Sequence, residues 1–279
     1  MKKLLTFILF ICFIINKNAI IYSASEALNI WSKSLFPVLY PTLILSDVLL
    51  ASGIINKIPK VLYNIYSRIF KTSPYGLFVF LVSVFSATPT NAKILKDLYD
   101  NKLIDKNSLS KILSQTIFFN PILILTFSNL KVLIIMWISN ILTSFILRNK
   151  LVSNDTTLKD INFKFNLNES IEKNMKTILN ILGTLTLFLS LSSIIPIKNQ
   201  ILKTFISGIL EITSGFSRIK LYLTSPLNDI MMLTFVSLAS FSIIMQIKSI
   251  LKETKFDSKY FYTSRFITLI LSLFIYFIA

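Results

Sequence analysis

The sequence has no histidine and a single cysteine, Cys12, among its 279 residues. A disulfide within the chain is therefore excluded, and the imidazole and thiolate ligands that zinc, haem and iron–sulfur sites use are missing. The same two absences exclude Ser-His-Asp and Cys-His nucleophilic sites. With only 5 glycines, the chain also has no glycine-rich phosphate loop. We therefore expect no cofactor, no bound metal and no enzymatic activity.

Charged residues are scarce as well, at 15% of the chain, where a soluble domain carries about a quarter. Hydrophobic residues make up 53%, and the mean hydropathy is +0.69. These values predict an all-α, multi-pass integral membrane protein whose main partner is the lipid bilayer. The net charge of +16 would suggest nucleic acid in a soluble protein. Here the cations lie in short loops between apolar runs, which indicates retention on the cytoplasmic side of a membrane and no nucleic-acid partner.

Long apolar runs are abundant, and about 20 such residues are enough to span a bilayer. A further apolar run, 74–90, ends in a polar cluster, and we predict that it is re-entrant. Residues 61–70 and 201–210 repeat one amphipathic spacing, which is typical of two helices lying on the membrane surface. The seven predicted spans are 4–22, 34–55, 112–128, 131–148, 174–196, 227–247 and 261–279.

The first run follows Met-Lys-Lys and resembles a signal sequence. Two alternatives stay open at this point. The segment is either cleaved near Ser23-Ala24-Ser25 or retained as a first membrane helix, a signal anchor.

The chain divides at a polar stretch into two halves with matching parts. We predict an N-terminal membrane helix over 1–25, a first gate-like half over 26–148, a polar linker over 149–173 and a second gate-like half over 174–279. Matching halves suggest an inverted repeat, as in many transporters, or a coincidence among isoleucine-rich helices.

Charge supports the re-entrant topology. It places 22 of the 29 cations on the cytoplasmic side, within residues 1–3, 57–71, 93–111, 148–176 and 248–265.

Polar residues at membrane depth mark the candidate solute site. Pro89 opens a helix, and broken helices are tolerated in lipid only where they are buried or line a cavity. The alternative is a helix end that is capped at the interface. A second break follows Gln115 and contains Asn120, where the alternative is hydrogen bonding between helices. The predicted substrate-binding residues of the first half are Ser86, Thr88, Thr90, Asn91, Gln115 and Asn120.

The second half contributes Glu211, Thr213, Ser240 and Gln246 to the predicted substrate site. A carboxylate near the membrane is costly unless it is paired or hydrated, so Glu211 is expected either to pair with Arg218 or to face water. Asp47, late in a predicted span, is a functional candidate for the same reason.

Five elements in order and spacing resemble the sporulation integral membrane protein family of the YlbJ type, which belongs to the nucleoside-recognition, or gate, domain group. Ser86-Ala87-Thr88-Pro89-Thr90-Asn91-Ala92-Lys93 resembles that family's Ser-Gly-Tyr-Pro-x-Gly-Ala-Lys, with Ala87 and Asn91 in place of its glycines and Thr88 in place of its tyrosine. The other elements are Ala27 to Leu50, Phe119-Asn120-Pro121, Leu210 to Gly215 and Ser242 to Gln246.

The resemblance implies a protein of the cell membrane that acts in endospore formation. Broken helices in two halves suggest a transporter-like gate for a small polar solute, with a nucleoside as one candidate. A non-transporting scaffold of a spore-envelope complex and a housekeeping solute transporter are the alternatives, and a homo-oligomer stays open. A transporter should have a hydrated path lined by Ser86, Asn120 and Ser240, whereas a scaffold should fill that space with phenylalanine and leucine.

Overall fold

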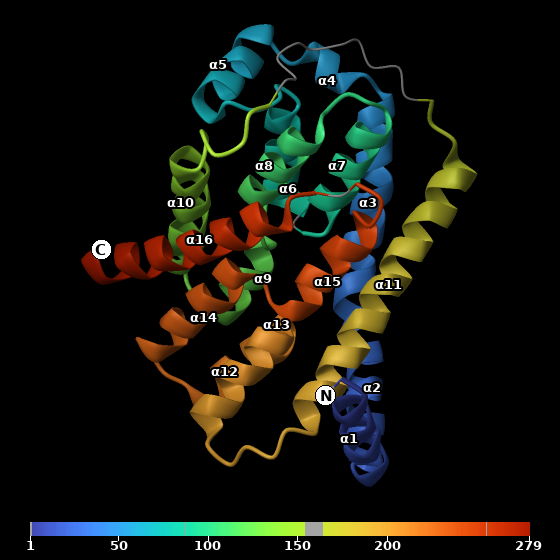
Figure 1. The fold of residues 1–279 in the computed structure, drawn as a ribbon, viewed down its shortest axis with the longest axis vertical. Helices are drawn as coiled ribbons and strands as arrows, with labels where there is room; N and C mark the ends of the chain where they lie inside the picture. The colour runs from blue at the N-terminus through green and yellow to red at the C-terminus, as the bar shows by residue number, and fades with distance from the viewer. Residues whose placement is uncertain (1, 87, 154–163, 255) are drawn as a thin grey trace.

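The computed structural model describes residues 2–86, 88–153, 164–254 and 256–279, and within these ranges it contains helices and no strand. Figure 1 shows the arrangement, with α3 and α11 running side by side along one flank. The first half contains α1 (Lys2–Ile15), α2 (Lys17–Ile30), the π-helical turn η1 (Trp31–Leu35), α3 (Phe36–Ala51), α4 (Ile54–Lys57), α5 (Lys60–Phe70), α6 (Gly76–Ser86), α7 (Thr90–Asp100), α8 (Lys106–Gln115), α9 (Pro121–Phe127) and α10 (Leu130–Ile146). The second half contains α11 (Leu167–Ser193), α12 (Gln200–Leu210), α13 (Ile212–Tyr222), α14 (Leu227–Leu238), α15 (Phe241–Ile250) and α16 (Ser258–Ile278).

Four helical segments are long and apolar enough to cross a membrane, and the seven predicted spans are not confirmed. Three helices, α6, α10 and α12, are apolar but shorter. The predicted span 112–128 is wrong as a single helix, because the chain leaves the helix after α8 and resumes it at Pro121. The four candidate spans among the described residues are Lys17–Ala51, Leu167–Ser193, Leu227–Ile250 and Ser258–Ile278.

The N-terminal boundary also differs from the prediction. Helices α2, η1 and α3 form one continuous helix of 35 residues, about 50 Å long, with no break at residue 25. The turn in the chain lies at Asn16 instead. Trp31 Nε1 donates to the Ile178 carbonyl oxygen at 3.0 Å and ties this long helix to α11. The predicted linker is shortened from its C-terminal side, since α11 begins at Leu167, while residues 154–163 lie outside the described part.

When α4 and α5, which lie between α3 and α6, are set aside, the two halves have the same order of elements. Each half then has a long helix (α3 or α11) and two helices joined by a short break (α6–α7 or α12–α13). A second broken pair (α8–α9 or α14–α15) and a closing helix (α10 or α16) complete each half. Helix α12 packs against α13. The location of residues 201–210 on the membrane surface stays a prediction.

Helix α12 buries small residues and exposes several of its large apolar side chains. Thr204, Ser207 and Gly208 are buried in α12, whereas Ile201 and Leu202 are exposed. Small residues at helix contacts and large apolar residues outside are typical of helices that face lipid. The apolar stripe of α12 is therefore consistent with contact to the bilayer.

Gly215 is where α12 and α13 approach most tightly. A Cβ built on Gly215 would lie 2.4 Å from the Cα of Gly208, which is backbone and cannot move aside like a side chain. We expect Gly215→Ala to lower the free energy of unfolding by about 1–3 kcal/mol, the usual cost of overpacking. Gly183→Ala in α11 is the matched control, since nothing lies within 4 Å of its Cβ position. Unfolding measured in mild detergent should separate the two, and equal stability of both variants would contradict this packing.

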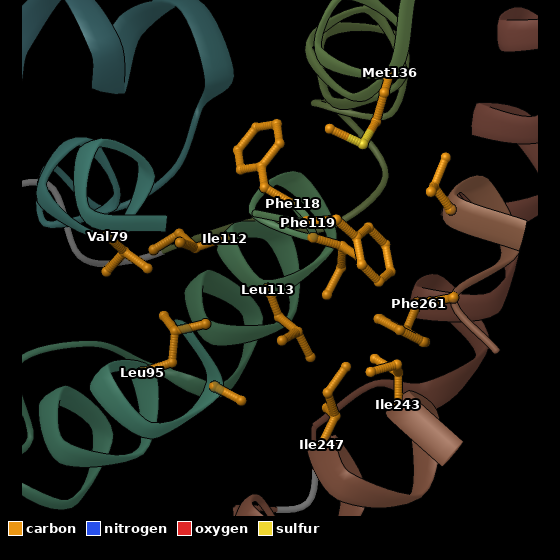
Figure 2. Packing of buried hydrophobic residues seen from close by; sticks show 14 of the residues in the cluster. Val79, Leu95, Ile112, Leu113, Phe118, Phe119, Met136, Ile243, Ile247 and Phe261 are labelled. Carbon is orange, nitrogen blue, oxygen red and sulfur yellow. The ribbon is translucent and has the colours of Figure 1, made fainter. Parts of the chain in front are cut away.

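The centre of the molecule between the halves is apolar. Figure 2 shows Leu113 and Phe119 of the first half pointing towards Ile243 and Phe261 of the second. An apolar filling of this kind is what a scaffold is expected to have.

Three cations that were counted as cytoplasmic loop residues lie inside the fold. Lys93, Lys111 and Arg265 have exposed fractions of 1%, 5% and 1%. The 22 cations assigned to the cytoplasmic side therefore include buried residues whose charged groups contact other helices and not the lipid surface. These buried cations lead to the functional site.

Candidate functional site

The two chain breaks of the first half contact each other. Pro89 precedes α7 and Asn120-Pro121 begins α9, so both helices restart at a proline-containing step, where a backbone donor is missing. The Thr88 amide donates to the Phe118 carbonyl oxygen at 2.9 Å. The Asn91 Nδ2 donates to the Thr116 carbonyl oxygen at 2.9 Å and to its Oγ1 at 3.2 Å. The breaks therefore form one junction inside the protein.

This junction holds several buried polar atoms that have no hydrogen-bond partner among the described residues. Leaving such an atom bare costs about 1–3 kcal/mol, so each one indicates a place for a polar ligand or water. Gln115 is half satisfied, because its Oε1 accepts a hydrogen bond from the Tyr66 hydroxyl while its Nε2 has no partner. The atoms without a partner are Thr88 Oγ1, Thr90 Oγ1, Asn91 Oδ1, Ser114 Oγ and Gln115 Nε2.

Arg265 extends the junction to α16. Its Nη2 donates to the Ser114 carbonyl oxygen and, at 3.0 Å, to Asn140 Oδ1 on α10. Asn140 in turn donates to the Ile117 carbonyl oxygen at 3.2 Å, inside the α8–α9 break. The Arg265 Nε and Nη1 have no partner, and no carboxylate among the described residues forms a salt bridge with this guanidinium. The junction thus contains a guanidinium group whose Nε and Nη1 can still donate hydrogen bonds to a ligand.

A network of buried salt bridges lies about one helical turn further along α7. Lys93 Nζ forms a salt bridge with Asp47 on α3 and lies 3.6 Å from Asp97 Oδ2. Lys173 on α11 pairs with the other oxygen of Asp97. The Asp47 Oδ2 also accepts hydrogen bonds from α11, at 2.6 Å from Ser170 and 2.8 Å from Asn174. Four charges of zero net sum therefore join α3, α7 and α11.

A cavity of about 180 Å³ opens next to this charge network, between the ends of α3 and α7 and the start of α11. Asp47, Asp97, Ser170 and Lys173 line it. The volume is enough for several water molecules. The charges are thus reached from one end of the molecule.

The structure brings together only part of the predicted site. Thr88, Thr90, Asn91 and Gln115 meet at the junction. Ser86 is close along the chain, but its hydroxyl donates to the Val82 carbonyl oxygen of its own helix. Asn120 caps α9, because its Oδ1 accepts from the amides of residues 122 and 123.

The second-half residues lie apart from the junction. Glu211 is 2% exposed and caps α13, accepting from the Ser214 amide at 2.8 Å and from the Thr213 hydroxyl at 2.5 Å. The expectation that Glu211 faces water or pairs with Arg218 is wrong, because Arg218 donates to Gln200 instead.

Two further residues of the second half were predicted to line the site. The Ser240 hydroxyl lies 3.2 Å from that of Ser242, and Gln246 donates to Thr184 at 3.1 Å. No hydrogen bond between described residues joins Glu211, Thr213, Ser240 or Gln246 to the junction.

Sequence reasoning missed Lys93, Asp97, Lys173, Asn140 and Arg265. One signal for the first two was available, since Lys93 and Asp97 stand four residues apart directly after the break, where opposite charges share a helix face. Arg265 stands seven residues into the helix, in an apolar span with no carboxylate within the next turn. Reading it as the end of a loop concealed its burial.

The chain is 28% identical over 102 residues to a protein of Bacillus subtilis (strain 168) named sporulation integral membrane protein YlbJ. The match covers 37% of this chain and 25% of the relative, so the matched stretch spans about a quarter of the relative's length. No protein-family model matches the chain. No solved structure matches it. The similarity and the apolar helices support a membrane protein distantly related to a sporulation protein.

Proposed function

We propose that this protein is a multi-pass protein of the cell membrane that acts in endospore formation as a transporter-like gate for a small polar solute. The role in sporulation comes from the distant similarity to a protein named for it. The gate is suggested by two halves with the same order of broken helices, which we take to be an inverted repeat. The proposal includes no catalytic step.

The observation that carries the gate is the set of unpartnered polar atoms at the junction. A protein with only a structural role gains nothing from bare hydroxyls and amides in its interior, because each one reduces stability. A solute that supplies both donors and acceptors would satisfy them. The free Nε and Nη1 of Arg265 favour a solute with strong acceptor oxygens, such as a carboxylate or a ribose with its base.

A scaffold is the second candidate, favoured by the apolar filling between the halves (Figure 2). A gate with this core must separate Phe119 from Phe261 to connect the two faces of the membrane, whereas a scaffold keeps them packed. A housekeeping transporter is the third candidate. It would move a solute in the same way as the first candidate, but it would serve vegetative growth and not endospore formation.

Two measurements test the proposal together. Deleting the protein in its host should reduce heat-resistant spores and leave vegetative growth near normal. Purified protein in liposomes should take up at least one solute from a set of nucleosides and small carboxylic acids. Spore loss without any uptake would support the scaffold. Uptake with normal spore counts and slow growth would support the housekeeping transporter.

A further inference from the structure

A cationic cavity of about 590 Å³ lies where α5 meets the C-terminal end of α10, away from the junction and the charge network. Arg68 and Lys71 come from the end of α5, and Arg148 follows α10; all three line the cavity. No acidic residue is among the described residues that line it. Figure 1 shows α5 and the end of α10 at the same end of the molecule.

A fourth cation lies beneath this cavity. Lys111 is 5% exposed, and its Nζ donates to the carbonyl oxygen of Lys71, to that of Arg148 at 2.8 Å and to that of Leu151 at 3.1 Å. These three residues line the cavity, so Lys111 holds its walls together and adds positive charge below them. The acidic residue nearest to Lys111 in sequence, Asp105, caps α8 and does not line the cavity.

Thr72 gives a second, independent sign of a ligand. It lines the cavity, is 3% exposed, and its Oγ1 has no hydrogen-bond partner among the described residues. The backbone around it is fixed, since the Ser67 hydroxyl donates to the Thr72 carbonyl oxygen at 2.7 Å. A buried hydroxyl that lines the same cavity as three cations can donate a hydrogen bond to an oxygen of a bound anion.

Helix α5 indicates where the anion comes from. Val61, Leu62, Ile65 and Ile69 are exposed on one side of this helix, while Tyr63 and Tyr66 are buried. An amphipathic helix with an unpartnered apolar side lies at the level of the lipid headgroups, with that side towards the acyl chains. The cavity at its C-terminal end is then level with the phosphate groups of the bilayer.

We propose that this cavity binds the phosphate group of an anionic phospholipid. Arg68, Lys71 and Arg148 pair with the phosphate, and the Thr72 hydroxyl donates to one of its oxygens. Basic pockets between membrane helices on the cytoplasmic side bind acidic headgroups in the same way. The inference is independent of the proposed transport.

Binding of phosphatidylglycerol and of phosphatidylcholine to the full chain in detergent, followed by native mass spectrometry, tests this site. We expect phosphatidylglycerol to bind more tightly, and Arg68→Gln to weaken its binding roughly tenfold, as expected for the loss of a charge-assisted hydrogen bond. Arg68 is exposed, and no hydrogen bond or salt bridge joins its side chain to another described residue, so this variant should fold. Lys60→Gln is the matched control, because Lys60 is exposed on the same helix and does not line the cavity.

Thr72→Val tests the hydroxyl. It should weaken phosphatidylglycerol binding several-fold while thermal stability in lipid-free detergent stays equal or rises, since an unpartnered hydroxyl is removed. Equal loss of lipid in Lys60→Gln and Arg68→Gln would overturn the site. Inorganic phosphate that stabilises the protein as well as phosphatidylglycerol, with no preference between the two lipids, would show a free-phosphate site and overturn the lipid assignment.

Discussion

Replacing Lys93 by methionine should destabilise the folded protein by about 3–5 kcal/mol, because it removes one partner from a buried ion pair and leaves the Asp47 carboxylate without a cation. Lys93 is 1% exposed and is shared between Asp47 and Asp97. The measurement is the free energy of unfolding in mild detergent. Lys96→Met is the matched control on the same helix. Lys96 pairs with Asp100 and Glu253 at a more exposed position, where such pairs contribute roughly 0–1 kcal/mol.

A second substitution separates charge from packing. Asp47→Asn in the Lys93→Met background should recover a large part of the lost stability, since an amide at residue 47 can still accept hydrogen bonds from Ser170 and Asn174. If the network also serves the proposed gate, the double variant should stay inactive in liposome uptake despite its stability. A Lys93→Met variant as stable as Lys96→Met would show that the buried pair is not what holds α3 to α7.

Replacing Thr90 by valine should reduce the function of the proposed gate while the protein keeps its stability. The Thr90 hydroxyl is fully buried and has no partner among the described residues, so valine removes no bond within the protein. A neutral hydrogen bond to a solute contributes about 0.5–1.5 kcal/mol, which corresponds to roughly two- to tenfold in uptake. Thr88→Val should act in the same direction, since its hydroxyl is also unpartnered.

Asn120→Ala is the contrasting control for this test. It removes the cap of α9, which costs about 1 kcal/mol, so uptake should fall only in proportion to the amount of protein in the membrane. Asn120→Asp should restore the cap. If Thr88→Val and Thr90→Val leave uptake per protein unchanged, the junction is not where the solute binds. If they lower abundance as Asn120→Ala does, their hydroxyls have structural partners.

Local chemistry explains which features could be read from the sequence. The low charge and high hydropathy determined the membrane class and the helical fold, because no other structure satisfies backbone groups in lipid apart from a closed barrel. Pro89 and Pro121 marked both breaks of the first half, because proline removes a donor wherever it stands in a helix. Thr88, Thr90, Asn91 and Gln115 followed as junction residues from their closeness to these breaks.

Tertiary structure alone decided which polar residues act together and which helices are single. Hydropathy predicted separate spans over 4–22 and 34–55. In the structure one helix runs from Lys17 to Ala51 and packs against α11. Arg265 reads as a loop cation from its neighbours, but its acceptor, the Ser114 carbonyl oxygen, is 151 residues away, and Asp47 finds Ser170 across 123 residues. A short stretch of sequence shows its composition and the prolines that interrupt a helix. Whether a charge is buried depends on partners that only the folded chain brings to it.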